Sequence, residues 1–266
     1  AIFLTHAQGI NGLDKKLYDY VQLNHIYLIE DVCESHGVRL PNGKKAGTAG
    51  DLSCFSFYYA HHMSTIEGGM ICTNNEDSYE ILRMLRSHGM VREMDNHKKR
   101  DEWIKKHLDL NDKFIFSRPA FNVRNNEIGA IIGLSQLKRL DAMVKKRSDN
   151  FELFLDLLPN WVFKDFQLEG QSNYAFNLIL NEPDQKLMSN LQLRLESNEI
   201  EYRRGSAGGG NQMRQPYVKK FMNFSDYDFK RIAPITDHIH FFGMYLGNYP
   251  ELNSSSIKEI VRIIKG

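Results

Sequence analysis

The sequence predicts an α/β protein in which a mostly parallel sheet is flanked by helices and is followed by a smaller α/β unit. Over the first half of the chain, short apolar runs alternate with stretches of helical periodicity, which is typical of a parallel sheet with crossover helices. Near residue 150 this pattern changes, and a smaller set of strands and helices begins. We therefore divide the 266 residues into a large unit, 1–148, and a small unit, 149–266.

The elements of the large unit follow from local patterns. Apolar runs predict strands at these positions: 1–5, 26–29, 52–59 and 70–73. Helical periodicity predicts helices over 13–23, 75–86 and 126–146, and Asn75 is suited to cap the second of them. Between the last two helices, the strongly charged stretch 93–113 is expected to be an exposed excursion.

The small unit is expected to contain a strand near 174–180, a helix near 185–197 and a strand over 200–204, followed by a glycine-rich loop. Three serines, Ser254–Ser256, precede Glu259 and indicate a final helix. The chain opens inside a predicted strand without a starting Met, so we expect that an N-terminal part of the protein is missing.

Composition and charge exclude several classes of protein. The chain is 42% hydrophobic and 25% charged, as in ordinary globular proteins, and Lys plus Arg number 34 against 33 Asp plus Glu. This balance argues against nucleic-acid and polybasic membrane partners, and no apolar run approaches the roughly 18–20 residues of a spanning helix. Three cysteines without C-x-x-C spacing, Cys33, Cys54 and Cys72, favour a reducing cytoplasm and no cysteine-built metal site.

The first candidate site feature is the acidic run E-D-V-C-E-S-H-G, from Glu30 to Gly37, directly after the predicted strand 26–29. Open α/β sheets bind ligands at the carboxyl ends of their parallel strands. One interpretation is simply a strand that ends in solvent. The other is an acid, Asp31, held at the sheet edge to pair with a cationic ring nitrogen.

The second feature is the run from Gly47 to Gly69, which contains G-D, F-S-F, A-H-H and T-I-E-G-G in that order. Together with L-R-S-H-G at 85–89 and F-N-V-R at 121–124, it resembles the DegT/DnrJ/EryC1/StrS family of pyridoxal-phosphate-dependent sugar aminotransferases. The resemblance extends from Ala1 to the end of the chain. It implies a fold-type-I transferase fold and a pyridoxal or pyridoxamine phosphate cofactor.

The sequence departs from the aminotransferases at one decisive position. Five residues after Ser56, where those enzymes carry the lysine that binds the cofactor covalently, this chain has His61, followed by His62. The substitution resembles the branch of the family that removes the 3-hydroxyl from nucleotide-linked 4-keto-6-deoxyhexoses, a step toward the 3,6-dideoxysugars of lipopolysaccharide O-antigens. An ordinary surface or packed histidine pair is the alternative.

The chemistry of imidazole agrees with that resemblance. It forms no stable imine, so the cofactor would be held non-covalently, and the task left at this position is proton transfer. At an ordinary pKa of about 6.5, imidazole is mostly a neutral base at pH 7, whereas an ordinary lysine is protonated. We expect His61 to be the catalytic base, although the sequence does not exclude His62.

The resemblance also implies supporting roles for matching positions. Asp31 would pair with the pyridine nitrogen, Glu34 would lie near the cofactor's 3-hydroxyl, and Ser56 would donate to its phosphate. Asn122 would reach that phosphate from a partner subunit, which implies a homodimer with shared active sites. Arg124 would help to anchor the substrate, or would be an ordinary surface arginine.

The third feature is a glycine-rich loop between Tyr202 and Tyr217, with the pattern G-N-Q-M-R-Q-P-Y at its end. No Lys-Ser/Thr pair follows the glycines, so the loop is not a P-loop. Arginine can contact a sugar diphosphate in bidentate fashion, and the final pattern resembles the substrate region of the dehydratase branch. The resemblance therefore makes Arg204 and Asn211 candidates for substrate binding. A loop without a ligand is the alternative.

Three alternatives concern the chemistry. Some dehydratases of this branch carry a cysteine-ligated [2Fe-2S] cluster, but 90–121, where those cysteines lie, contains no Cys, and four thiolates are usual. The cluster-free type, which uses glutamate as amino donor, is therefore favoured, with GDP or CDP as the nucleotide. An ordinary transaminase would need another lysine, and none lies between Cys54 and Arg92. A catalytically silent relative is the third alternative.

Overall fold

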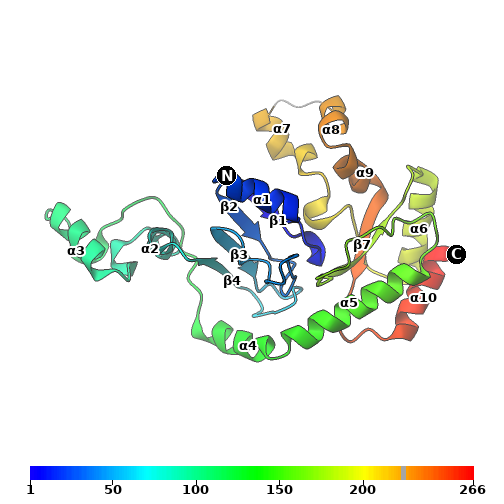
Figure 1. Ribbon diagram of the computed structural model, residues 1–266, viewed down its shortest axis with the longest axis horizontal. Coiled ribbons are helices and arrows are strands. Elements are labelled where there is room, and N and C mark those ends of the chain that lie inside the picture. The colour runs from blue at the N-terminus through cyan, green and yellow to red at the C-terminus, as the bar shows by residue number, and fades with distance from the viewer. Residues whose placement is uncertain (223–225) are drawn as a thin grey trace.

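The computed structural model describes residues 1–222 and 226–266 and consists of two units joined by a pair of helices. Figure 1 shows a sheet in the middle of the molecule, a second sheet with α6 and α10 at one end, and α2 and α3 as an arm at the other end. Helices α4 and α5 run along one side of the molecule and connect the arm to the small unit (Figure 1).

The sheet of the large unit has four strands in sequence order: β1 (Ile2–Thr5), β2 (Leu28–Asp31), β3 (Leu52–Ser56) and β4 (Gly69–Thr73). The first three are parallel, and β4 runs antiparallel to β3. The sheet is therefore mostly parallel, as the sequence predicts. Because β1, β2 and β3 share a direction, their carboxyl ends lie at one edge of the sheet.

The predicted helices of the large unit are present. Helix α1 (Lys15–Leu23) begins at Asp14, whose side chain accepts the amide of Leu17. Helix α2 (Glu76–Leu85) is capped by Asn75, as predicted. The charged excursion is more ordered than expected, because it contains α3 (His97–Lys106). A small core forms at the base of this arm from the following residues: Met84, Val91, Met94 and Ile115.

The helix predicted over 126–146 is wrong in extent. The structure has two helices, α4 (Glu127–Leu137) and α5 (Leu140–Leu157), separated by a tight turn in which the amide of Arg139 donates to the carbonyl of Gln136. Neither Gly nor Pro marks this turn, so the sequence pattern runs through it. The predicted boundary at 148/149 falls inside α5, and Phe151 and Phe154 near its end are buried in the small unit.

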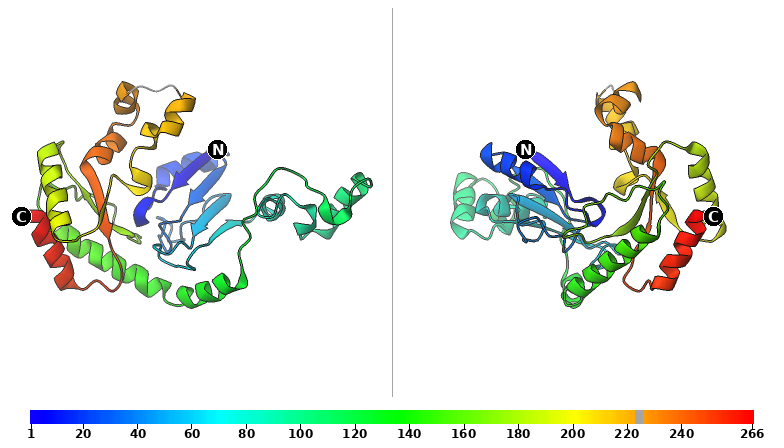
Figure 2. Two further views of the ribbon diagram at one scale, coloured as in Figure 1. Left: turned by 180° about the vertical axis from the view of Figure 1, so that it is seen from behind. Right: turned by 45° about the vertical axis from the view of Figure 1, so that its right-hand side comes forward.

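The small unit is an antiparallel sheet covered by helices. Its strands are arranged in the order β5 (Ala175–Ile179), β7 (Gly243–Gly247) and β6 (Tyr202–Arg204). Helices α6 (Gln185–Ser197) and α10 (Ser254–Lys265) pack with α5 in one apolar core, and Figure 2 shows α10 beside α5.

Short helices complete the chain. Between β6 and β7 lie α7 (Pro216–Met222), α8 (Asp226–Ile232) and α9 (Pro234–Phe242). Single 3-10 turns occupy Ala7–Gly9, Val91–Glu93, Asp112–Phe114, Ala207–Gly209 and Gln212–Arg214.

Candidate active site at the carboxyl edge of the sheet

The carboxyl edge of the parallel strands collects the polar residues that the sequence singled out. Asp31 is the last residue of β2 and lies in register with Thr5 of β1 and Cys54 of β3. Ser56 is the last residue of β3. Since ligands of open α/β sheets bind at such edges, the position of Asp31 and Ser56 agrees with the predicted site.

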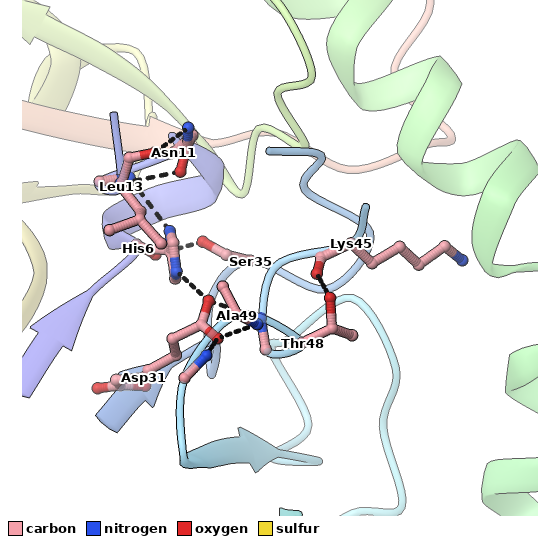
Figure 3. Close-up of polar contacts among 12 residues, drawn as sticks. His6, Asn11, Leu13, Asp31, Ser35, Lys45, Thr48 and Ala49 are labelled. Carbon is pink, nitrogen blue, oxygen red and sulfur yellow. Dashed lines mark hydrogen bonds and ion pairs between the residues drawn. The ribbon is translucent and has the colours of Figure 1, made fainter. Parts of the chain in front are cut away.

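A buried hydrogen-bond network stabilises this edge. The carboxylate of Glu30 accepts the amides of Gly47 (2.9 Å), Ala49 (2.8 Å) and Gly50 (2.7 Å), and it contacts Nε2 of His6 at 3.1 Å. Figure 3 shows this network, with His6 and Ala49 labelled. Burial raises the pKa of Glu30, but these hydrogen bonds outweigh it and lower the pKa overall.

The next residue of β2, Asp31, belongs to the opposite face, because successive strand side chains alternate. Its Oδ1 accepts the amide of Cys33 at 3.0 Å, and it remains half-buried. The loop after β2 therefore begins with an acid whose position is fixed on both sides: by the strand before it and by this turn after it.

His61 lies in the loop after β3, where its amide donates to the carbonyl of Tyr58 at 3.0 Å. Its half-buried ring lies edge-on to the rings of Tyr58 and Tyr174, with centroids 5.6 Å away in both cases. In the part of the chain that the structure describes, Nδ1 is buried without a hydrogen-bond partner. The imidazole is thus oriented by aromatic contacts while this nitrogen is unengaged.

The environment keeps His61 neutral. Burial lowers the pKa of the imidazole below its ordinary value of 6.5, while the backbone of Ser56 and the carboxylates of Asp31 and Glu67 act in the opposite direction. Since the net shift is downward, His61 is an uncharged base at neutral pH. Asp31 and the backbone of Ser56 are thus close enough to His61 to influence its pKa.

His62 lies in a different environment. Only 3% of it is exposed, and its Nε2 lies 2.7 Å from the carbonyl oxygen and 2.9 Å from Oγ of Ser172. Burial lowers its pKa well below the ordinary value. Because its ring is enclosed and its Nε2 is engaged, His62 does not share the position of His61 at the sheet edge.

Glu34 lies close to Asp31 in the same loop. It is half-buried, and its Oε2 accepts the amide of Gln8 at 3.2 Å. Burial raises the pKa of Glu34, and repulsion from Asp31 adds to this, whereas the bond from Gln8 and attraction to Arg203 oppose it. Four predicted residues are therefore brought together: Asp31, Glu34, Ser56 and His61.

The small unit contributes residues that the sequence did not single out. A cavity of about 490 Å³ lies between it and the loop that precedes His61, lined in part by Tyr59, Tyr174, Arg203 and Tyr245. Arg203 is the register partner of Tyr245. Burial, together with the Glu34 and Tyr245 side chains, raises the pKa of Tyr174 to about 12.

Arg204 does not line this cavity. Like Arg203 it is exposed, and it pairs in register with Met244. That Arg204 binds substrate stays a prediction.

The remaining predicted residues lie apart from His61. Asn122 and Arg124 are exposed on the segment before α4, and Nε of Arg124 donates to Oδ1 of Asn122 at 3.2 Å. Asn211 is only 1% exposed: it donates to Asp237 at 3.2 Å and accepts the amide of Met213 at 3.1 Å. Its observed contacts stabilise the glycine-rich loop, and its role toward substrate stays a prediction.

The donor set at the sheet edge fits a pyridoxal-type cofactor. The carboxylate of Asp31 at a strand end suits the ring nitrogen of such a group, and the hydroxyl of Ser56 on the neighbouring strand suits its phosphate. The imidazole of His61, with its unpartnered and buried Nδ1, suits a reaction at the carbon beside the ring. No group of three or more His, Cys, Asp or Glu side chains among the described residues is arranged to hold a metal ion.

This fold and site define an α/β protein with a small-molecule site at the carboxyl edge of its larger sheet, closed on one side by a smaller unit. The chain belongs to the DegT/DnrJ/EryC1/StrS aminotransferase family, whose pattern matches residues 1–265. The family and the fold expected from the sequence motifs are thereby confirmed.

Two curated members of the family that resemble this chain carry the same name. The chain is 35% identical over 246 residues to GDP-4-keto-6-deoxy-D-mannose 3-dehydratase of Yersinia pseudotuberculosis, covering 90% of this chain and 60% of the relative. It is 34% identical over 226 residues to the same-named protein of Escherichia coli O55:H7, covering 84% of this chain and 56% of the relative. The chain thus spans less than two thirds of the length of these relatives.

A solved structure gives the same comparison in three dimensions. The E. coli GDP-4-keto-6-deoxy-D-mannose-3-dehydratase with bound hydrated pyridoxal phosphate superposes with a TM-score of 0.83 at 28% identity, covering 99% of this chain and 66% of that chain. The fold seen here is therefore that of a protein crystallised with this cofactor.

Proposed function

We propose that this chain is part of a pyridoxamine-phosphate-dependent 3-dehydratase of a nucleotide-linked 4-keto-6-deoxyhexose, which makes a 3,6-dideoxysugar precursor for lipopolysaccharide. The observation that carries the proposal is His61: a half-buried, neutral imidazole at the position of the aminotransferase lysine, next to Asp31. The two dehydratases with which the chain shares about a third of its residues support the same assignment.

Each residue of the site has a defined task. The carboxylate of Asp31 pairs with the protonated ring nitrogen of the cofactor, and the hydroxyl of Ser56 donates to its phosphate. When bound, pyridoxamine phosphate would supply the amine that condenses with the sugar's C4 ketone, and a ring that accepts the electron pair released by proton removal and returns it as the C3 hydroxyl leaves. The imidazole of His61 accepts the proton from the carbon that bears this amine. Glu34 lies where it can contact the ring's 3-hydroxyl.

Binding of the nucleotide sugar is assigned to both units. The cavity next to the loop that precedes His61 offers Arg203 and several tyrosines, and arginine suits the diphosphate of such a substrate. Arg204, Asn211 and Arg124 remain candidates for further contacts. The names of the two similar dehydratases favour GDP over CDP as the nucleotide.

A homodimer completes the proposal. Helix α4 exposes these apolar side chains on its surface: Ile128, Ile131, Leu134 and Leu137. Such a face is typical of a covered surface, and Asn122, exposed just before α4, would reach the cofactor phosphate of a second copy.

We further propose glutamate as amino donor and the cytoplasm as the compartment. Among the helices described here, none is both long and apolar enough to span a bilayer.

The test is to supply the protein with pyridoxal phosphate, glutamate and GDP-4-keto-6-deoxymannose and to follow the sugar by mass spectrometry and ammonia by a coupled assay. Replacement of the sugar's C3 hydroxyl by hydrogen, seen as the loss of one oxygen atom in mass, with release of ammonia and 2-oxoglutarate, supports the proposal. Transfer of an amino group to the sugar would instead identify a transaminase. The CDP-linked 4-keto-6-deoxyglucose, run in parallel, decides the nucleotide.

A further inference from the structure

His62 is bound to a distant part of the chain. Its Nε2 lies 2.7 Å from the carbonyl oxygen of Ser172, which is 110 residues away in sequence and precedes β5. A carbonyl can only accept a hydrogen bond, so Nε2 carries the hydrogen and donates it. The Ser172 hydroxyl lies 2.9 Å from the same nitrogen and is itself 2.6 Å from the carbonyl of His36, which it bonds as donor. The contact is fully buried.

Ser172 is in turn fixed to the large unit. Its amide donates to the carbonyl of Gly9 at 2.8 Å, and two residues later the amide of Tyr174 donates to the carbonyl of Gln8 at 3.1 Å. The two backbone segments approach so closely that a Cβ on Gly9 would lie 1.8 Å from the carbonyl oxygen of Ser172. The segment that accepts the His62 hydrogen bond is therefore anchored on both sides, and its position is defined.

This anchor also places the ring that His61 contacts. Tyr174 lies two residues after Ser172, and its ring meets that of His61 edge-on, with centroids 5.6 Å apart. One hydrogen bond thus ties the residue next to His61 to the segment that carries the aromatic neighbour of His61. Loss of that bond would release the His61 side of the contact, while the bonds to Gly9 and Gln8 keep Tyr174 in place.

We infer that His62 is a positioning residue for His61: the hydrogen bond from its Nε2 to the Ser172 carbonyl holds the loop so that the imidazole of His61 stays packed against Tyr174. The catalytic consequence rests on the proposed function, but the positional one does not. His62 is not assigned as the base, because its ring is only 3% exposed and its unprotonated Nδ1 is enclosed within the protein.

Two variants separate the hydrogen bond from the volume of the ring. His62→Gln keeps a donor near the Nε2 position, and His62→Phe keeps a ring but has no donor. In cofactor-free protein with isotope-labelled histidine, NMR titration follows the His61 imidazole, assigned by its loss in His61→Ala. We expect the low pKa of His61 in wild type and His62→Gln, and a rise toward the ordinary value of 6.5 in His62→Phe.

Each outcome decides the inference. A folded His62→Phe protein with an unchanged His61 titration would overturn it. If His62→Phe does not fold, which thermal unfolding will show, His62→Gln decides: an unshifted His61 titration supports the inference and a shifted one contradicts it. In the dehydratase assay, kcat of His62→Phe should fall at least about tenfold at unchanged KM, with His62→Gln within about threefold of wild type. An inactive wild type would refute the proposed function alone, since the titration needs no turnover.

Discussion

His6 donates its Nε2 hydrogen to the buried carboxylate of Glu30, at 3.1 Å. The direction is fixed because Nδ1 of His6 accepts the amide of Gly12, also at 3.1 Å. The imidazole of His6, the residue after β1, therefore binds the carboxylate of Glu30 on β2, and that carboxylate in turn binds the loop 47–50 before β3. The pair thus links the end of β1, the strand β2 and the loop before β3 by hydrogen bonds.

Replacement of Glu30 should therefore destabilise the whole sheet edge. In Glu30→Gln an amide nitrogen would face backbone N–H donors, leaving at least one of them unsatisfied. We expect the free energy of unfolding to fall by about 3 kcal/mol, measured by urea denaturation at pH 7. The exposed control Glu169→Gln should stay within about 0.5 kcal/mol of wild type; equal losses in the two variants would contradict the role of Glu30.

The buried ring of His36 should make the protein sensitive to mild acid. The ring is 3% exposed, lies between Phe55 and Phe57, and has no hydrogen-bond partner for either nitrogen within the described residues. Burial, with a smaller contribution from His61, lowers its pKa from 6.5 to about 4. Between these values the unfolded chain binds a proton that the folded protein does not, so stability falls as pH falls, by up to about 1.4 kcal/mol per pH unit.

His36→Leu removes this proton linkage without breaking a hydrogen bond. Urea unfolding at pH 7 and pH 5 should show a smaller loss of stability for His36→Leu than for wild type, whereas His25→Asn, at an exposed site, should lose as much as wild type. A loss in His36→Leu equal to that of wild type would show that His36 is not the linked group.

The close approach of Gly9 to Ser172 predicts a position-specific cost of adding a methyl group. Gly9 has φ of +85° and no room for a Cβ, while Gly43 has φ of +78° and nothing within 4 Å of the Cβ position. Gly43→Ala should cost only the backbone strain, about 1–2 kcal/mol. Gly9→Ala should cost at least about 3 kcal/mol because the two backbones must separate. Thermal and urea unfolding compare them, and equal stability would disprove a tight junction.

The two adjacent arginines of β6 should differ in their effect on substrate binding. Arg203 lines the cavity next to the loop that precedes His61, and Arg204 does not. Loss of a charge-assisted contact corresponds to about 1.5 kcal/mol or more, so Arg203→Gln should raise KM for the nucleotide sugar at least about tenfold. Arg204→Gln should change it less than about threefold. A larger effect at Arg204 would return the assignment to the residue predicted from sequence.

Much of the fold and half of the site could be predicted from the sequence for a physical reason. Strand and helix patterns are local, and the positions of Asp31, Ser56 and His61 follow from where parallel strands end. Tyr174 and Arg203 could not be predicted in the same way, because their approach to His61 depends on how the small unit sits on the large one. The turn between α4 and α5 was missed because helical periodicity continues through it.

The distinction between His61 and His62 also needed the structure. Adjacent histidines have the same chemistry in a sequence, and only the structure shows that His62 binds the Ser172 carbonyl, 110 residues away, while His61 is half-buried beside Tyr174. The spacing from Ser56 selected His61, but it could not reveal what holds that residue in place.

The most direct measurement compares wild type with His61→Ala in the assay with pyridoxamine phosphate and GDP-4-keto-6-deoxymannose, with cofactor affinity measured on the same samples. We predict that His61→Ala binds pyridoxamine phosphate within about threefold of wild type but loses ammonia release by at least about a hundredfold, as expected for removal of a general base. Ammonia release by His61→Ala at the wild-type rate would contradict the assignment of His61 as the base.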